Sequence, residues 1–191
     1  MMKQKKLKVG FDFDGVIAYN PLRVLRKPVN MIMRVILGKS SLEYYPQSKQ
    51  SQWLWKILHK SSFLPSPGLK DLRKLLEEDK IEGYIITGRF AMLDEDLRRW
   101  LQQHEIEHLF KRIYVNKKNK FPYIFKEEMI NKLKLDYFLE DNWDVIKYLN
   151  RSLPKQSKTQ LHWIYNIIDH FIPYKNKHPH LSSFLTTITK K

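Results

Sequence analysis

The stretch KVGFDFDGVIAYN, residues 8–20, places two aspartates one residue apart at the end of a short apolar run, and a glycine follows them at once. β-Branched and aromatic residues favour a buried strand, and Asp-Gly is a turn signal. The stretch therefore predicts a first strand that ends at Asp12 and Asp14. An ordinary turn that carries acidic residues is the alternative, and the rest of the chain has to decide between the two.

Strand and helix patterns alternate along the rest of the chain. Apolar residues at helical spacing predict helices, and runs rich in β-branched and aromatic residues predict strands. The further predicted strands are IEGYIITGR (81–89), RIYV (112–115), DYFLED (136–141) and QLHWIYNI (160–167), each preceded by a helical segment. Such alternation predicts an α/β fold, with a Rossmann-like parallel sheet and helices on both of its faces.

The domain organisation follows from an interruption of this alternation. A helical pattern fills the segment after the first strand, and PSPG at residues 65–68 ends it. We expect a core made of residues 1–15 and 66–172 and a small helical cap insertion at residues 16–65. Residues 173–191 carry too little pattern for an assignment and are interpreted as a basic tail.

Composition excludes several classes of protein. The 191 residues include no cysteine, so disulfides and thiolate metal sites are impossible, and a cytoplasmic location is expected. The basic N-terminus resembles a signal peptide, but Asp12 and Asp14 interrupt its apolar stretch. The longest apolar stretch, PVNMIMRVILG at residues 28–38, is shorter than the roughly 18–20 residues of a membrane span. We therefore expect no membrane span.

The net charge of +15 is unevenly distributed. Lysine and arginine outnumber acidic residues by eight to one in residues 15–66 and by seven to one in residues 151–191, whereas residues 67–150 hold sixteen of each. Such a field attracts anions such as phosphate groups, although a basic surface that only aids solubility is the alternative.

The residues that end the predicted strands are polar. In an open parallel α/β sheet, ligands bind at the carboxyl ends of the strands. Three converging carboxylates repel one another unless a cation lies among them, and oxygen ligands favour Mg²⁺, which would in turn hold a phosphate. The polar residues at these ends are Asp12, Asp14, Thr87, Gly88, Glu140 and Asp141.

These residues resemble the four motifs of the haloacid dehalogenase-like (HAD) phosphatases. GFDFDGV resembles the first motif, YIITGR the second and YFLEDNWD the fourth. Lys126 has the spacing of the third motif, with Lys132 and Lys134 as rivals. The resemblance covers residues 7–150, and a cap directly after the first motif resembles the 5′(3′)-nucleotidase-like branch.

The resemblance implies a role for each matching residue. Asp12 is expected to be the nucleophile and Asp14 the general acid and base. Mg²⁺ is expected on the Asp12 side chain, the Asp14 backbone carbonyl and Asp141. Thr87 and Lys126 are expected to bind the remaining phosphoryl oxygens.

Five further residues have less defined expectations. Gly15 and Gly88 would let the backbone approach the phosphate, and Arg89 is expected to bind substrate. Glu140 is either a second ligand contact or only a neighbour. Asp144 either orients the loop or caps the helix that begins near residue 143.

Together these observations predict a Mg²⁺-dependent phosphomonoesterase that acts on a small phosphorylated metabolite such as a nucleoside monophosphate. One alternative is a phosphatase of nucleic-acid ends, which would use the basic cap and tail. The other is a basic phosphate-binding module without turnover. Arginines such as Arg23 and aromatic residues such as Trp53 in the cap could contact substrate, but a solvated face and a small apolar core are the plain interpretations.

Two histidine patterns are interpreted as misleading. HEIEH at residues 104–108 matches the H-E-x-x-H pattern of zinc proteases, but Ile106 is out of phase with the preceding helix, so a continuous helix is not expected. His178 and His180 resemble a metal-binding fragment and are expected in a solvated tail.

Overall fold

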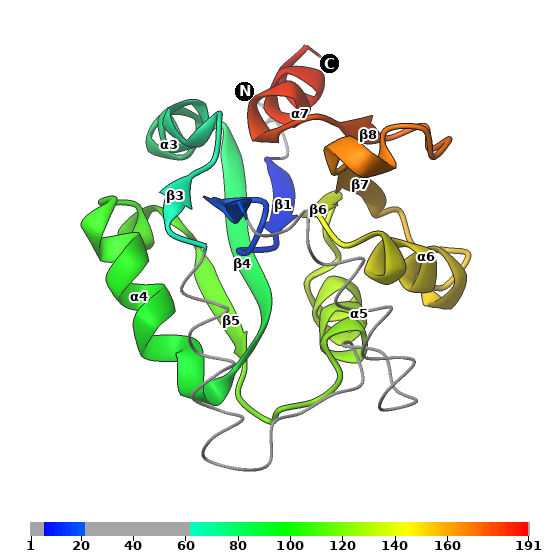
Figure 1. The fold of residues 1–191 in the computed structure, drawn as a ribbon, viewed down its shortest axis with the longest axis horizontal. Coiled ribbons are helices and arrows are strands. Elements are labelled where there is room, and N and C mark those ends of the chain that lie inside the picture. The colour runs from blue at the N-terminus through cyan, green and yellow to red at the C-terminus, as the bar shows by residue number, and fades with distance from the viewer. Residues whose placement is uncertain (1–5, 22–61, 191) are drawn as a thin grey trace, which may run out of the picture.

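The computed structural model describes residues 6–21 and 62–190 (Figure 1). Its main feature is a six-stranded sheet with the order β5-β4-β1-β6-β7-β8, in which all neighbouring strands are parallel. The strands are β1 (Leu7–Phe11), β4 (Ile81–Phe90), β5 (Arg112–Asn116), β6 (Tyr137–Glu140), β7 (Gln160–Ile164) and β8 (Lys177–His178). The predicted α/β parallel sheet is confirmed.

Helices cover both faces of this sheet (Figure 1). They are α3 (Leu69–Glu77), α4 (Asp94–Gln103), α5 (Pro122–Leu133), α6 (Trp143–Ser152) and α7 (Leu181–Thr189). Short 3₁₀ turns lie at Ala91–Leu93, Glu107–Leu109 and Ile167–Asp169. Apolar side chains of α3, α4 and α7 pack in one core cluster and those of α5 and α6 in another.

Both faces of the central strands are apolar, which is why the sheet is buried on both sides. Successive strand residues point to opposite faces. Ile85 of β4 packs in the cluster of α3, α4 and α7, whereas its neighbours Tyr84 and Ile86 pack in the cluster of α5 and α6. Because helices pack on both faces, the central strands are held in place from both sides.

A two-stranded antiparallel ribbon brackets the predicted cap. Strand β2 (Ala18–Tyr19) pairs with β3 (Leu64–Pro65), so the chain leaves and re-enters the core at neighbouring points. The predicted cap residues between them, Arg23 and Trp53 included, lie mostly outside the described residues. The boundaries of the cap therefore stay a prediction.

The C-terminal segment differs from the expected tail. Strand β8 extends the sheet, and α7 buries one side, with Leu181, Phe184, Leu185 and Ile188 inside the core. His178 is only 6% exposed, so the expectation that it lies in a solvated tail is wrong. The sequence alone did not predict what the apolar side of α7 packs against, because that surface is formed by α3 and the sheet.

The H-E-x-x-H pattern does not lie on one helix. Helix α4 ends at Gln103, and Glu105 has a left-handed φ of 53°. The imidazoles of His104 and His108 therefore do not share a helical face. Within residues 6–21 and 62–190, no helix has the length and apolar character that crossing a membrane requires.

Candidate active site

The carboxyl ends of three neighbouring strands bring the predicted site residues together. Strand β1 lies between β4 and β6 in the sheet and pairs with both. Asp12 follows β1, Thr87 lies near the end of β4, and Glu140 ends β6. All three side chains are buried. The topology rule that ligand sites lie where parallel strands end therefore applies to this edge of the sheet.

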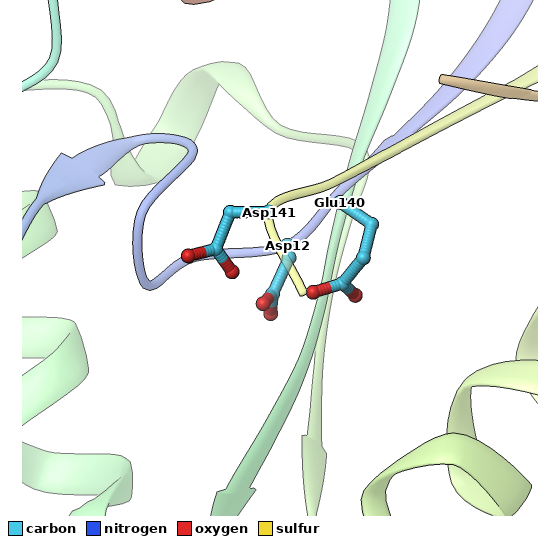
Figure 2. A group of neighbouring side chains, drawn as sticks. All are labelled: Asp12, Glu140 and Asp141. Carbon is cyan, nitrogen blue, oxygen red and sulfur yellow. The ribbon is translucent and has the colours of Figure 1, made fainter. Parts of the chain in front are cut away.

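Three buried carboxylates form a cluster at this edge (Figure 2). Asp12, Glu140 and Asp141 each offer one carboxylate oxygen, and these oxygens all lie within 4.8 Å of one another. Among the described residues, Oδ1 of Asp12 is buried and has no hydrogen-bond partner. A buried oxygen without a donor and an all-oxygen donor set fit a hard divalent cation such as Mg²⁺.

Lys126 is the lysine that reaches this cluster. Its Nζ lies 3.0 Å from Oδ2 of Asp12 and 2.6 Å from Oε2 of Glu140. Lys126 is buried in the first turns of α5, whereas Lys132 and Lys134 at the other end of that helix are exposed. The position in the helix, rather than the residue type, distinguishes Lys126 from its two rivals.

Burial and charge shift the pKa values in this cluster in definite directions. Burial raises the pKa of Asp12 well above its usual value; Lys126 opposes this, and the nearby Glu140 and Asp141 add to it. Burial also raises the pKa of Glu140, again against the effect of Lys126. For Lys126, burial lowers the pKa, but the two carboxylates outweigh it and raise the pKa above its usual value. Burial thus opposes the charges of Asp12 and Glu140 in spite of Lys126, and a further cation would stabilise them.

Gly15 makes room for one of the carboxylates. It has a left-handed φ of 78°, and a Cβ at this position would lie 2.1 Å from Oδ2 of Asp141. The absent side chain therefore serves the approach of Asp141, which is a different reason from the expected approach of a phosphate. At Gly88, a Cβ would lie 2.7 Å from Cβ of Pro122, so this glycine serves the close packing of β4 on the start of α5.

Asp14 lies beside the acidic cluster and is paired with an arginine. Arg89 donates from Nε to Oδ2 of Asp14 at 2.8 Å and from Nη2 to Oδ1 at 2.7 Å. Both side chains are almost fully buried. The hydroxyl of Thr87 accepts a hydrogen bond from the backbone N–H of Arg89 at 3.2 Å.

Two acidic residues of the fourth motif have defined partners. Glu140 bonds Lys126 with one oxygen, and its other oxygen accepts from the backbone N–H of Asn142 at 3.0 Å. Glu140 is therefore part of the cluster, a role that the acidic pair in the sequence left open. Asp144 is not the helix cap, because the Asn142 side chain accepts from the backbone N–H of Asp144 and caps α6. The Asp144 carboxylate instead lies 2.7 Å from Nζ of Lys147.

Comparison with known proteins gives matches in structure and none in sequence. No protein-family profile and no curated protein matches the chain. The solved structures of similar fold include YfnB from Bacillus subtilis, which is predicted to be a HAD hydrolase and was solved bound to magnesium. It has a TM-score of 0.58 and 14% identity, covering 97% of this chain and 100% of its own.

Two further structures agree with this match. A protein from Haemophilus somnus, predicted to be a phosphoglycolate phosphatase, has a TM-score of 0.56 and 14% identity over 98% of this chain and 100% of its own. CbbY from Rhodobacter sphaeroides, solved in complex with phosphate, has a TM-score of 0.53 and 13% identity over 93% of this chain and 96% of its own. The narrower resemblance to the 5′(3′)-nucleotidase-like branch stays a prediction. The fold of this chain is that of the HAD-superfamily hydrolases.

Proposed function

We propose that this protein is a Mg²⁺-dependent phosphomonoester hydrolase that works through an aspartyl-phosphate on Asp12. The observation that carries the proposal is the buried Oδ1 of Asp12, which has no hydrogen-bond partner among the described residues and lies within a cluster of three carboxylates. The HAD fold and its magnesium-bound and phosphate-bound neighbours support the same chemistry.

Asp12 is the proposed nucleophile. Its carboxylate attacks phosphorus in line, the bond from phosphorus to the leaving oxygen breaks, and Asp14 gives that oxygen a proton. In the second half, Asp14 takes a proton from water as the water oxygen displaces Asp12 from phosphorus. The ester thus yields an alcohol and inorganic phosphate, and both aspartates return to their starting states.

The other residues stabilise charge. Asp12, Asp141 and Glu140 are the side chains proposed to hold Mg²⁺, with the backbone carbonyl of Asp14 as a further ligand. When bound, Mg²⁺ would neutralise charge between the nucleophile and the phosphate. Lys126 and the Thr87 hydroxyl are proposed to bind phosphoryl oxygens, where fixed donors meet developing charge.

The proposed substrate is a small phosphorylated metabolite, and nucleoside monophosphates are among the first to test. Phosphate release from a panel of phosphomonoesters should require Mg²⁺ and stop when the metal is chelated. A phosphorylated oligonucleotide belongs in the panel, because its turnover should weaken steeply as salt rises, whereas turnover of a mononucleotide should respond mildly.

The decisive variant is Asp12→Asn, which keeps the size of the side chain and removes its nucleophilic charge. We expect phosphate release to fall by at least about 1,000-fold, because the covalent step is lost. Asp71→Asn is the matched control, since Asp71 is exposed in the first turn of α3. Phosphate release by Asp12→Asn at the parent rate would overturn the nucleophile assignment.

A further inference from the structure

A bulge in β4 turns Arg89 into the interior of the site. Pairing with β5 matches Thr87 with Val115 and Phe90 with Asn116, so two residues of β4, Gly88 and Arg89, have no partner in the register. Bulges beside active sites commonly redirect a side chain in this way. Arg89 is only 5% exposed, although it is a charged residue near the end of β4.

The guanidinium of Arg89 is fixed on two sides. Its fork makes two hydrogen bonds, at 2.8 and 2.7 Å, to the two carboxylate oxygens of Asp14. Its central carbon lies 4.6 Å from the centroid of the Phe13 ring, in a cation–π arrangement. A bidentate pair fixes the plane of a carboxylate as well as its position, which a single donor cannot do.

This arrangement matters because Asp14 has to act at a defined place. Transfer of a proton to a leaving oxygen requires the carboxyl group to stay within hydrogen-bond reach of it. A carboxylate has about four lone-pair sites, and the Arg89 fork uses two of those on Asp14. The ammonium group of Lys126 bonds Asp12 and Glu140, whereas the guanidinium of Arg89 holds Asp14.

We propose that Arg89 is a positioning residue that acts on the reaction through Asp14 and does not bind the phosphate. The proposal rests on the proposed function and replaces the expectation that Arg89 is a substrate ligand. Arg89 holds the Asp14 carboxyl plane toward the leaving oxygen. It therefore assists the steps in which Asp14 gives and takes a proton.

Leaving-group dependence tests this assignment. The value of kcat/KM reports the first chemical step. In that step the leaving oxygen of an alkyl phosphate needs a proton, whereas the leaving oxygen of dinitrophenyl phosphate does not. We expect Arg89→Gln to lower kcat/KM for the alkyl phosphate by about 100-fold and to leave that for dinitrophenyl phosphate nearly unchanged. An equal loss for both substrates, expressed as a higher KM, would return Arg89 to substrate binding and overturn the proposal.

Two further variants keep the test decisive if Arg89→Gln fails to fold. Arg89→Lys keeps the charge but loses the fork, so it should show the same selective loss of kcat/KM for the alkyl phosphate. Full activity of Arg89→Lys would contradict the proposal, because charge without the fork would then suffice. Phe13→Leu removes the ring below the guanidinium and should give a smaller loss with the same selectivity for the alkyl phosphate. An equal loss for both substrates in Phe13→Leu would contradict the proposal.

A double-mutant cycle isolates the route through Asp14. Arg89→Gln should cost nothing further for the alkyl phosphate once Asp14→Asn is in place, whereas an additive loss would contradict the proposal. The control is Arg98→Gln, because Arg98 pairs with Asp94 and Glu107 away from the site, and both substrates should be unaffected. If the proposed function itself fails, the parent releases no phosphate from either substrate, which differs from every outcome above.

Discussion

Two buried polar groups of this protein contrast in charge. At the carboxyl edge of β1 and β6, Asp12 and Glu140 share the ammonium group of Lys126 in a cluster with Asp141, and burial raises the pKa of Asp12. Between β7 and β8, His162 and His178 share a hydrogen bond of 2.8 Å among aromatic rings, and burial lowers the pKa of His178.

The difference separates a ligand site from a structural contact. In a neutral imidazole pair one ring donates to the other, and burial favours that neutral state. Buried carboxylates such as Asp12 and Glu140 carry a charge that burial opposes, even beside the ammonium group of Lys126. Buried charge that exceeds its compensation is therefore the stronger indication of a missing ligand.

The largest effect is expected when the only ammonium group in the described cluster is removed. Without Mg²⁺, Lys126→Met should lower the free energy of unfolding by about 3–5 kcal/mol, because Asp12 and Glu140 are left buried without their partner. Denaturant unfolding measures this loss, and Mg²⁺ should restore part of it. Lys132→Met, at an exposed position of the same helix, is the control, and an equal effect of the two variants would contradict the comparison.

Gly15→Ala should lower activity by about 100-fold, because the new Cβ pushes the Asp141 carboxylate away from its place. The measurement is kcat together with the Mg²⁺ concentration for half-maximal activity, which should rise. Gly68→Ala is the matched control, since Gly68 also has a left-handed φ and its Cβ would clash with Ser182, on the face of α3 and α7. The control should lose stability without a change in the Mg²⁺ requirement.

Magnesium itself should stabilise the folded protein. At a free Mg²⁺ concentration of 100 times Kd, the expected gain is about 2.7 kcal/mol, measured as a rise in Tm on addition of the metal. Asp141→Asn should abolish most of this rise, whereas Asp71→Asn should keep it. A parent protein whose Tm does not change with Mg²⁺ would contradict the proposed metal site at the acidic cluster.

The smallest effect concerns the histidine pair. Burial, with a contribution from His180, lowers the pKa of His178 from its usual 6.5, so the unfolded chain takes up a proton before the folded one does. Stability should therefore be complete above about pH 6.5 and fall below it, with a loss of a few degrees in Tm by about pH 5. His178→Asn should reduce this pH dependence, whereas His108→Asn, at an exposed position, should not. A Tm of the parent protein that does not change between about pH 7 and about pH 5 would contradict this prediction.

The sequence predicted much of this site because strand ends can be identified locally. Asp12, Thr87 and Asp141 each follow an apolar run, and parallel strands direct such positions to one edge. The partners of Glu140, Arg89 and His178 could not be predicted in the same way. Their partners, Lys126, Asp14 and His162, lie 14, 75 and 16 residues away, and no local pattern selects a partner at such separations.

The sequence by itself determined the α/β alternation and the acidic residues that follow the strands, because hydrophobic periodicity and turn residues act over a few positions. Only the tertiary structure decided which lysine enters the cluster, which carboxylate Arg89 holds and where the C-terminal helix packs. Those choices depend on the bulge in β4, the missing side chain at Gly15 and the surface shared by α3 and α7, which exist only once distant segments are packed together.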